Sequence, residues 1–395
     1  MPYKILFYDD APFFGGHEAM TLNAVEYITL SSGTGANVSF VFHSGNSNLR
    51  RRLEALAQKS QTLSLYPIEY RSRRLQHFRT MFSRRKICII KSLIRQIDPD
   101  VVVVSQGGIG ISSLGLVAAA QQGYKTISYI PMVHKPSITS SGMMNIRDLI
   151  TNATNHTKFS NFIEKKLYNM PNKFITVNKK TALSLTKITS KSVETVYNGI
   201  DINKYPIKDK YASRKELGLP LKSTIVGLIG RIDFNQKGQD FLVETVHKFR
   251  HLLDSLTFLI VGSGPHEKQL RQLISHRHLE EKFVIISWND NIPLIYSSID
   301  MLVIPSKFEG LPLVMLEGMY YKLPVIASCT DGMAELLPPE WLFRPGDRSD
   351  FATRILSVLR NITQHENILE RNHQTIKQCF TIESFGKKFF DALIS

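Results

Sequence analysis

The chain has 395 residues, enough for two domains of ordinary size, and its 43% hydrophobic and 21% charged residues are typical of a soluble globular protein. Its three cysteines lack metal-ligand spacing and form no disulfide framework, so a reducing compartment is expected. The formal net charge of +15 is uneven, because residues 1–200 carry 25 basic and 11 acidic side chains whereas the remainder carries 24 and 23. Two halves of such different charge are expected to contact different partners.

The N-terminal sequence MPYKILFYDD leads directly into an apolar strand, which is unlike a secretory signal. Residues 101–124 carry no charge, but Ser105, Gln106 and the glycines after them divide this stretch into a strand, a loop and a helix. That division argues against a transmembrane segment. We therefore expect a cytoplasmic protein.

Short apolar runs alternate with helical patterns along the chain. In the first half, strands are expected at 4–8, 37–42, 101–105, 126–131, 173–177 and 193–197. In the second half, they are expected at 224–229, 257–261, 283–286, 301–304 and 324–327. Such alternation builds parallel sheets, and the polar segment 202–222 has the composition of a linker. The sequence predicts an α/β fold.

The loop after the first strand contains Gly15 and Gly16, and a helical pattern follows to about Leu30. Two glycines between a strand and a helix let the backbone approach a ligand closely. A Gly-Gly pair is more often only a turn, so both interpretations stay open. Asp9 and Asp10 before it form no convincing metal motif.

Residues 70–97 hold nine basic side chains and no acidic one. Apolar side chains recur there at helical spacing in two sets, Leu75, Phe78 and Phe82, and then Ile89, Leu93 and Ile97. A basic helix with an apolar face suits an anionic membrane surface, so peripheral contact with the inner face of a membrane is one prediction. The alternative is a domain helix packed through Ile89, Leu93 and Ile97. Nucleic acid is not expected, because no nucleic-acid-binding motif accompanies the charge.

The predicted strand 224–229 runs directly into Gly230 and Arg231, and Lys237 and Gly238 end the loop. A guanidinium can bind two phosphate oxygens at once, and an ammonium adds a point charge. Cations fixed at a leaving diphosphate would act by electrostatic catalysis. The alternative is a chance pair of surface bases.

The loop after the strand 257–261 starts with Gly262 and has a G-x-G pattern. A dinucleotide-binding fingerprint needs a third glycine, but position 267 is a glutamate, so an NAD site is excluded. Trp288 lies just beyond the strand 283–286, where it could stack on a ligand or be an ordinary partly buried tryptophan.

Residues 299–328 predict a strand, a loop, a helix and a second strand, with Glu309 in the loop and Glu317 one turn into the helix. Both acids then lie at the carboxyl end of a strand, where ligands bind open α/β sheets. The helix start near Leu313 and Val314 leaves free backbone N–H groups that suit a phosphate. A carboxylate can accept hydrogen bonds from two neighbouring hydroxyls, such as a ribose diol. The pattern indicates a sugar-nucleotide site, against the alternative of two unrelated surface acids.

The string EGLPLVMLEGMYYKLPVIAS, which begins with Glu309 and Gly310, resembles the E-x7-E signature of retaining glycosyltransferases with the GT-B fold, especially glycosyltransferase family 4. The G-R-x5-K-G string at 230–238 and the N-G-I-D turn at 198–201 also resemble landmarks of that family. The resemblance implies two facing Rossmann-like domains with an interdomain cleft. They would comprise 1–198 joined by a helix at 381–395, and 199–380.

The resemblance also implies roles for the second half. Glu317 would hold the ribose, and Glu309 with Gly310 the donor sugar. Arg231 and Lys237 would hold the diphosphate. The backbone near Gly262, Leu313 and Val314 would also contact the nucleotide, and Trp288 would lie near the base.

In the first half, Gly15 and Gly16 would lie near the donor phosphates and the acceptor. His134, just past the strand 126–131, would contact the donor sugar. A lone histidine is more often structural, and that alternative stays open.

The implied activity is retaining transfer of a hexosyl unit from a UDP- or GDP-sugar to a hydroxyl, without a metal or other cofactor. A lipid-linked or membrane-borne glycan is one candidate acceptor. Two alternatives are a catalytically silent, membrane-associated binding protein and a sugar-nucleotide epimerase.

Overall fold

The computed structural model describes residues 2–31, 33–73, 76–133, 162–289 and 291–395. The chain divides into two compact units, of which the first comprises Met1–Tyr197 with Phe385–Ser395 and the second Asn198–Ser384. These boundaries lie one residue before the first boundary expected from the sequence and four residues after the second.

The described residues of the first unit form one seven-stranded sheet, whose strands are all parallel. The strands are β1 (Tyr3–Asp9), β2 (Ala36–His43), β3 (Leu63–Ile68), β4 (Val101–Ser105), β5 (Lys125–Tyr129), β6 (Lys173–Thr176) and β7 (Ser192–Thr195). Their order, β3-β2-β1-β4-β5-β6-β7, is that of a doubly wound Rossmann-like fold. The central strand β4 is buried throughout, as its run of four valines requires.

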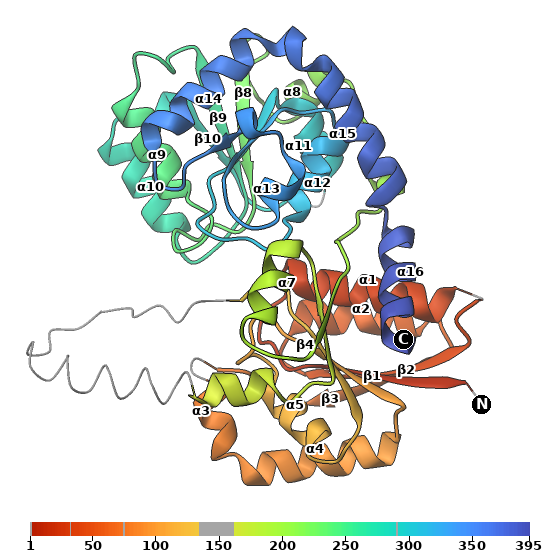
Figure 1. Cartoon of the computed structure of the whole chain (residues 1–395). Helices are drawn as coiled ribbons and strands as arrows, with labels where there is room; N and C mark the ends of the chain where they lie inside the picture. Colours follow the sequence, from red (N-terminus) through yellow and green to blue (C-terminus); the bar gives the residue numbers. More distant parts are fainter. Residues whose placement is uncertain (1, 32, 74–75, 134–161, 290) are drawn as a thin grey trace, which may run out of the picture. The chain divides into compact units, whose positions relative to one another are not determined.

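Helices cover both faces of this sheet. Figure 1 shows α1, α2 and α16 on one face and α3, α4 and α5 on the other. The bounds are α1 (Gly16–Leu30), α2 (Ser47–Ala57), α3 (Gln76–Met81), α4 (Arg84–Ile97), α5 (Ser113–Ala120), α7 (Lys179–Thr186) and α16 (Ile382–Ile394).

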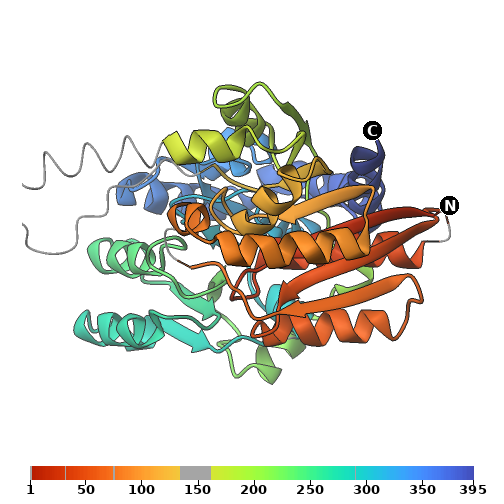
Figure 2. The same ribbon diagram turned by 90° about the horizontal axis from the view of Figure 1, so that it is seen from below.

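The C-terminal helix α16 lies beside the N-terminal elements of the chain (Figure 2). The ring of Phe389 stacks on Phe7 of β1 at 6.3 Å between centroids and meets Tyr129 of β5 edge-on at 5.0 Å. Gly386 packs so closely on Tyr27 of α1 that an added Cβ would lie 2.2 Å from the ring. The last residues of the chain therefore complete one face of its first sheet.

The two segments that connect the units pair with each other within the second unit. The Ile200 N–H donates to the carbonyl of Phe380 at 2.9 Å, and the Ile382 N–H donates to the carbonyl of Ile200 at 3.0 Å. A Cβ on Gly199 would lie 2.2 Å from the carbonyl oxygen of Thr381, so only glycine fits there.

In the described ranges, the second unit has a six-stranded parallel sheet in the order β10-β9-β8-β11-β12-β13. Its strands are β8 (Thr224–Ile229), β9 (Leu256–Val261), β10 (Phe283–Ile286), β11 (Met301–Ile304), β12 (Val325–Ser328) and β13 (Leu342–Phe343). The helices are α8 (Lys210–Glu216), α9 (Gln239–Lys248), α10 (Glu267–His276), α11 (Ile292–Ser298), α12 (Leu313–Tyr320), α13 (Met333–Leu336), α14 (Arg348–Arg360) and α15 (Glu366–Cys379). The strand order reverses between β8 and β11, which makes the carboxyl ends of these strands the topological switch point.

The alternative predicted for the basic segment 70–97, a domain helix packed through Ile89, Leu93 and Ile97, is correct for Leu93 and Ile97 and wrong for Ile89. Helix α4 buries Ile87, Ile90 and Ile94 in the core of the first unit. Phe78, Leu93 and Ile97 pack against the same core, because the helix turns this stripe toward the sheet. Ile89 is 45% exposed, so it does not pack as this alternative expects. Phe82 is 81% exposed, the membrane contact stays a prediction, and Leu75 lies outside the described residues.

Among the helices that the structure describes, none has both the length and the apolar character needed to cross a membrane. The uncharged stretch 101–124 forms β4, a loop and α5, as its glycines predict.

Candidate functional site

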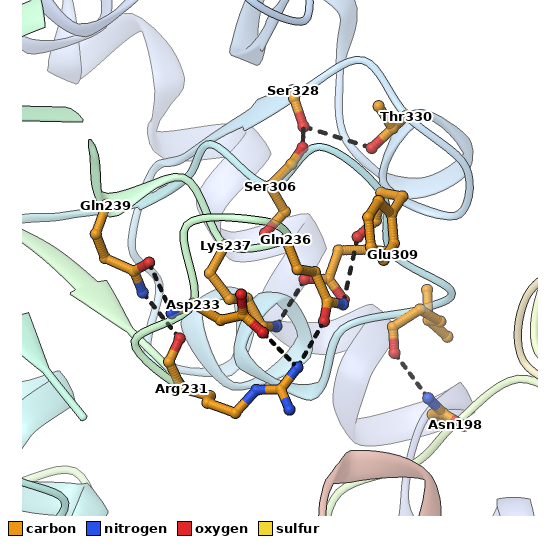
Figure 3. A network of polar contacts seen from close by, with 12 residues as sticks. Asn198, Arg231, Asp233, Gln236, Lys237, Gln239, Ser306, Glu309, Ser328 and Thr330 are labelled. Atoms are coloured by element: carbon orange, nitrogen blue, oxygen red, sulfur yellow. Dashed lines mark hydrogen bonds and ion pairs between the residues drawn. The ribbon is translucent and has the colours of Figure 1, made fainter. Parts of the chain in front are cut away.

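The loops after β8 and β11 lie against each other at the switch point of the second sheet (Figure 3). The Lys307 N–H donates to the carbonyl of Gln236, and Lys307 Nζ donates to the carbonyl of Phe234, both at 2.8 Å. Gly238 adopts a φ of 75°, and a Cβ there would lie 2.4 Å from the carbonyl oxygen of Pro305. The two loops can therefore pack this closely only with a glycine at position 238.

The loops carry a buried ion pair. Lys237 Nζ lies 2.6 Å from Glu309 Oε1, and the two side chains are 19% and 8% exposed (Figure 3). The sequence predicts these groups separately, one for a diphosphate and one for a sugar. The structure brings them together, so each neutralises the charge of the other in a site largely withdrawn from water.

Arg231 points along the same site, with its guanidinium Nη2 3.0 Å from Asp233 Oδ2 and 3.1 Å from Gln236 Oε1 (Figure 3). Gln239 fixes the backbone beneath it, since its Nε2 donates to the carbonyl of Arg231 at 2.9 Å and its Oε1 accepts from the Asp233 N–H at 3.2 Å. The Arg231 side chain is 54% exposed. Its head is accessible to an anion that competes with Asp233.

The Gly262 loop packs on the backbone of the Arg231 loop. A Cβ on Gly262 would lie 2.0 Å from the carbonyl oxygen of Gly230, and one on Gly264 would lie 2.3 Å from that of Ile232. The Ile232 N–H donates to the carbonyl of Ser263 at 3.0 Å. The glycines are therefore explained by close backbone packing, and a contact of Gly262 with a ligand stays a prediction.

The segment between the two glutamates is held by hydrogen bonds to its carbonyls. The Gly332 N–H donates to the carbonyl of Gly310 at 3.0 Å, and Asn198 Nδ2 donates to that of Leu311 at 2.7 Å (Figure 3). Helix α12 then begins at Leu313, and within the described structure no side chain caps it at Pro312. The first-turn N–H groups of a helix have no intrahelical partners, which suits them to an anion.

Glu317 is buried in α12, and both of its carboxylate oxygens accept a hydrogen bond from a tyrosine. Tyr205 Oη lies 2.7 Å from Oε1, and Tyr296 Oη lies 2.5 Å from Oε2. Burial raises the pKa of Glu317, while these two hydrogen bonds act in the opposite direction. The carboxylate is held by neutral donors in place of a cation.

The predicted residues of the first half lie in the other unit. Gly15 precedes α1, and its N–H donates to Glu18 Oε2 at 2.8 Å, while Gly16 is the first residue of the helix. Both glycines are exposed. His134 lies outside the described residues, so its contact with the sugar stays a prediction.

Beneath the Gly15–Gly16 loop lies a buried polar cluster that the sequence does not predict. Ser105 Oγ donates to Asp9 Oδ2 at 2.9 Å and lies 2.9 Å from His17 Nε2. Burial lowers the pKa of His17 to about 3, so its imidazole is neutral at ordinary pH. Burial, with the nearby charge of Glu18, raises the pKa of Asp9 well above its usual range.

Asp233, Gln239, Tyr205 and Tyr296 are the site residues of the second unit that sequence reasoning missed. Asp233 lies between the predicted Arg231 and Lys237, and Gln239 follows them. Their polar side chains, so close to the two cations in sequence, were the signal that could have identified them as site residues. Tyr205 precedes α8 and Tyr296 lies in α11, both far from Glu317 in the sequence. Only the folded chain shows that they converge.

Residues 223–361, which lie in the second unit, match the family described as "Glycosyl transferases group 1". The N-acetyl-alpha-D-glucosaminyl L-malate synthase of Bacillus anthracis is 26% identical over 203 residues, or 51% of this chain and 53% of that protein. The lipopolysaccharide core biosynthesis mannosyltransferase LpsB of Rhizobium meliloti (strain 1021) is 28% identical over 202 residues, or 49% of this chain and 55% of that protein. The chain thus spans about half the length of the curated relatives it matches.

Solved structures match along the whole chain. The structure of Anabaena Alr3699/HepE in complex with UDP and glucose superposes with a TM-score of 0.78 at 17% identity, over 99% of each chain. That of WaaG, a glycosyltransferase involved in lipopolysaccharide biosynthesis, gives 0.71 at 13% identity, over 98% of this chain and 99% of WaaG. The chain therefore has the GT-B fold, as predicted, and residues 223–361 of its second unit are similar to the glycosyl transferases group 1 family.

Proposed function

We propose that the protein is a retaining glycosyltransferase of family 4 that moves a hexosyl unit from a UDP- or GDP-sugar to a hydroxyl group. The observation that carries this proposal is the Lys237–Glu309 pair, buried at the switch point of a glycosyltransferase group 1 domain. It joins a diphosphate-binding cation to a carboxylate suited to sugar hydroxyls. The curated relatives named above are an N-acetyl-alpha-D-glucosaminyl L-malate synthase and a mannosyltransferase, and one structural neighbour holds UDP and glucose.

The diphosphate would exchange with the carboxylates that now neutralise the two cations. Arg231 would leave Asp233, and Lys237 would move its charge from Glu309 toward the phosphates, which frees Glu309 to accept hydrogen bonds from the donor sugar. Two cations at the leaving diphosphate stabilise the negative charge that develops there. The first-turn N–H groups of α12, near Leu313 and Val314, would assist them.

The chain would supply this positive charge itself, so we propose that transfer needs no divalent metal. We propose a same-face mechanism, in which the leaving phosphate takes the proton of the acceptor hydroxyl as the glycosidic bond to the acceptor forms. The anomeric configuration is then retained without a covalent glycosyl-enzyme.

For the acceptor, we propose a membrane-borne glycan or glycolipid. The relatives include proteins of lipopolysaccharide biosynthesis, but they also include the N-acetyl-alpha-D-glucosaminyl L-malate synthase, whose name points to a small acceptor. The exposed Phe82 and Ile89, with the exposed Arg79, Arg84 and Arg85, would form the contact with an anionic inner membrane face. Sedimentation with anionic vesicles should fall when the three arginines become serine, and unchanged sedimentation would remove this part of the proposal.

The comparisons do not favour the two alternatives. A silent binding protein has no need of the complete set of Arg231, Lys237, Glu309 and Glu317, and the two curated relatives named above are a synthase and a mannosyltransferase, not epimerases.

A donor screen tests the proposed activity. Purified protein is incubated with UDP- and GDP-sugars in EDTA, and nucleotide release is followed with and without a membrane lipid extract. We expect release from one donor, lost in Glu309→Gln and kept in the control Glu244→Gln, whose carboxylate pairs with Arg277 at 2.9 Å. Release that survives Glu309→Gln would contradict the assigned site, and a lack of release from every donor would contradict the activity.

A further inference from the structure

The carboxylate of Glu317 is held by hydroxyls and not by charge. The residue is 8% exposed, and in the described part of the chain burial and the hydrogen bonds of Tyr296 and Tyr205, but no nearby cation, act on its carboxylate. Tyr205 and Tyr296 each donate to a different oxygen, at 2.7 and 2.5 Å. An ionised carboxylate can accept about four hydrogen bonds, two on each oxygen. The tyrosines use one on each oxygen, so one acceptor position on each oxygen remains.

The two tyrosines are themselves fixed by a third. The ring of Tyr321 stacks on Tyr296 at 5.1 Å between centroids and meets Tyr205 edge-on at 6.5 Å. The Tyr321 hydroxyl donates elsewhere, to the carbonyl of Pro206 at 3.2 Å. Two segments distant from α12 in sequence therefore converge on one carboxylate, and packing against the ring of Tyr321 keeps the two donor hydroxyls in place.

We propose that Tyr205, with Tyr296, is a positioning residue that fixes Glu317 to distinguish a ribose from a deoxyribose. This inference rests on the proposed nucleotide-sugar donor. The tyrosine hydroxyls set the plane of the carboxylate and favour its ionised form. One acceptor position on each oxygen is then presented in fixed directions to the two vicinal hydroxyls of the ribose.

A fixed carboxylate makes this distinction better than a mobile one. Both ribose hydroxyls gain a charged acceptor without the cost of ordering it, whereas a nucleotide that lacks one hydroxyl leaves a buried acceptor unpaired. A carboxylate free to rotate could turn its oxygens toward water and lose that penalty. Tyr205 is the more informative of the pair, because it is only partly buried whereas Tyr296 is fully buried, so its hydroxyl can be removed with less effect on the core.

The test is calorimetric binding of UDP, GDP and their 2′-deoxy analogues to the full chain. Wild-type protein should bind one ribonucleotide about tenfold or more tightly than its 2′-deoxy analogue, the effect of one hydrogen bond to a charged acceptor. In Tyr205→Phe this ratio should fall to about threefold or less, mainly through weaker binding of the ribonucleotide. Tyr321→Phe is the matched control, because it removes a hydroxyl from the same cluster that does not bond Glu317, and it should keep the wild-type ratio.

The other possible results would each contradict part of the proposal. An unchanged ratio in Tyr205→Phe, or an equal loss in Tyr321→Phe, would show that Tyr205 acts through packing alone. Tighter ribonucleotide binding by Tyr205→Phe would show that the tyrosine competes with the ribose. A wild type that binds ribo- and deoxyribonucleotides equally would overturn the inference but leave the donor class intact, whereas a wild type that binds neither nucleoside diphosphate would overturn the proposed donor itself.

Discussion

Replacement of Lys237 by methionine should destabilise the second unit, because it leaves the Glu309 carboxylate without its partner. Glu309 is 6% exposed as a residue, and its oxygen lies 2.6 Å from Lys237 Nζ. Removing one member of a buried pair costs ~3–5 kcal/mol. Since Lys237 keeps 19% exposure, water reaches this pair in part, and we expect about 3 kcal/mol, at the low end of that range.

The reverse substitution should cost less. In Glu309→Gln, the uncompensated group is the partly exposed ammonium, which can extend toward water, and we expect about 1 kcal/mol. In the double variant no buried charge is left alone. It should therefore be more stable than the sum of the single effects predicts, with a coupling of ~2 kcal/mol.

Urea unfolding followed by tryptophan fluorescence measures this effect in the right part of the molecule. The chain has two tryptophans, Trp288 and Trp341, and both lie in the second unit, so their signal reports that unit. The control is Lys282→Met, which breaks a pair of 2.8 Å with Asp254, whose side chain is 78% exposed, and should leave the midpoint unchanged. If Lys237→Met also left the midpoint unchanged, or if the two single effects were additive, that would falsify the buried coupling.

Three further predictions concern groups outside this pair. Trp288 is 52% exposed and Trp341 fully buried, so nucleotide binding near Trp288 should quench the red-shifted part of the emission, and Trp288→Phe should abolish the quenching. Burial raises the pKa of Glu317, so its carboxylate becomes protonated as the pH falls, and nucleotide binding, which needs the ionised form, is lost. Tyr205→Phe removes a hydrogen bond that favours the ionised form, so the acid limb of a plot of nucleotide affinity against pH should move to higher pH. An unmoved limb would contradict the assigned hydrogen bond. Burial lowers the pKa of His17 to about 3, so below pH ~6.5 this histidine is protonated in the unfolded chain but stays neutral in the folded one. The free energy of unfolding should therefore fall by about 2 kcal/mol between pH 7 and 5, and His17→Gln should lose that part of the pH dependence.

The strands that the sequence predicts best are those whose burial on both faces leaves a continuous apolar run. β4, β8 and β11 have the predicted bounds for this reason. β10 also has the predicted bounds, because its sequence is an apolar run although it is an edge strand with only Phe283 buried. β3 was missed, because an edge strand that contains a proline and is only partly buried carries no such run.

Side-chain direction and distant partners were beyond the sequence. The spacing of Ile89, Leu93 and Ile97 is helical, yet the buried stripe of α4 runs through Ile87, Ile90 and Ile94, and only the position of the sheet decides between them. In the site, the charged residues could be chosen from short strings. The ion pair of Lys237 with Glu309 and the two tyrosines on Glu317 depend on which loops become neighbours.

The position of α16 affects the order in which the two units can fold during synthesis. Phe389 covers Phe7 and Tyr129, and Gly386 fits against Tyr27, so α1 and α2 cover their face of the first sheet only in part until α16, which follows the second unit in sequence, has been made. The second unit, Asn198–Ser384, is by contrast one continuous stretch. During synthesis the second unit can therefore finish folding first. The first unit stays incomplete until α16 is made, and the uncovered apolar part of its sheet is a surface that a chaperone would recognise.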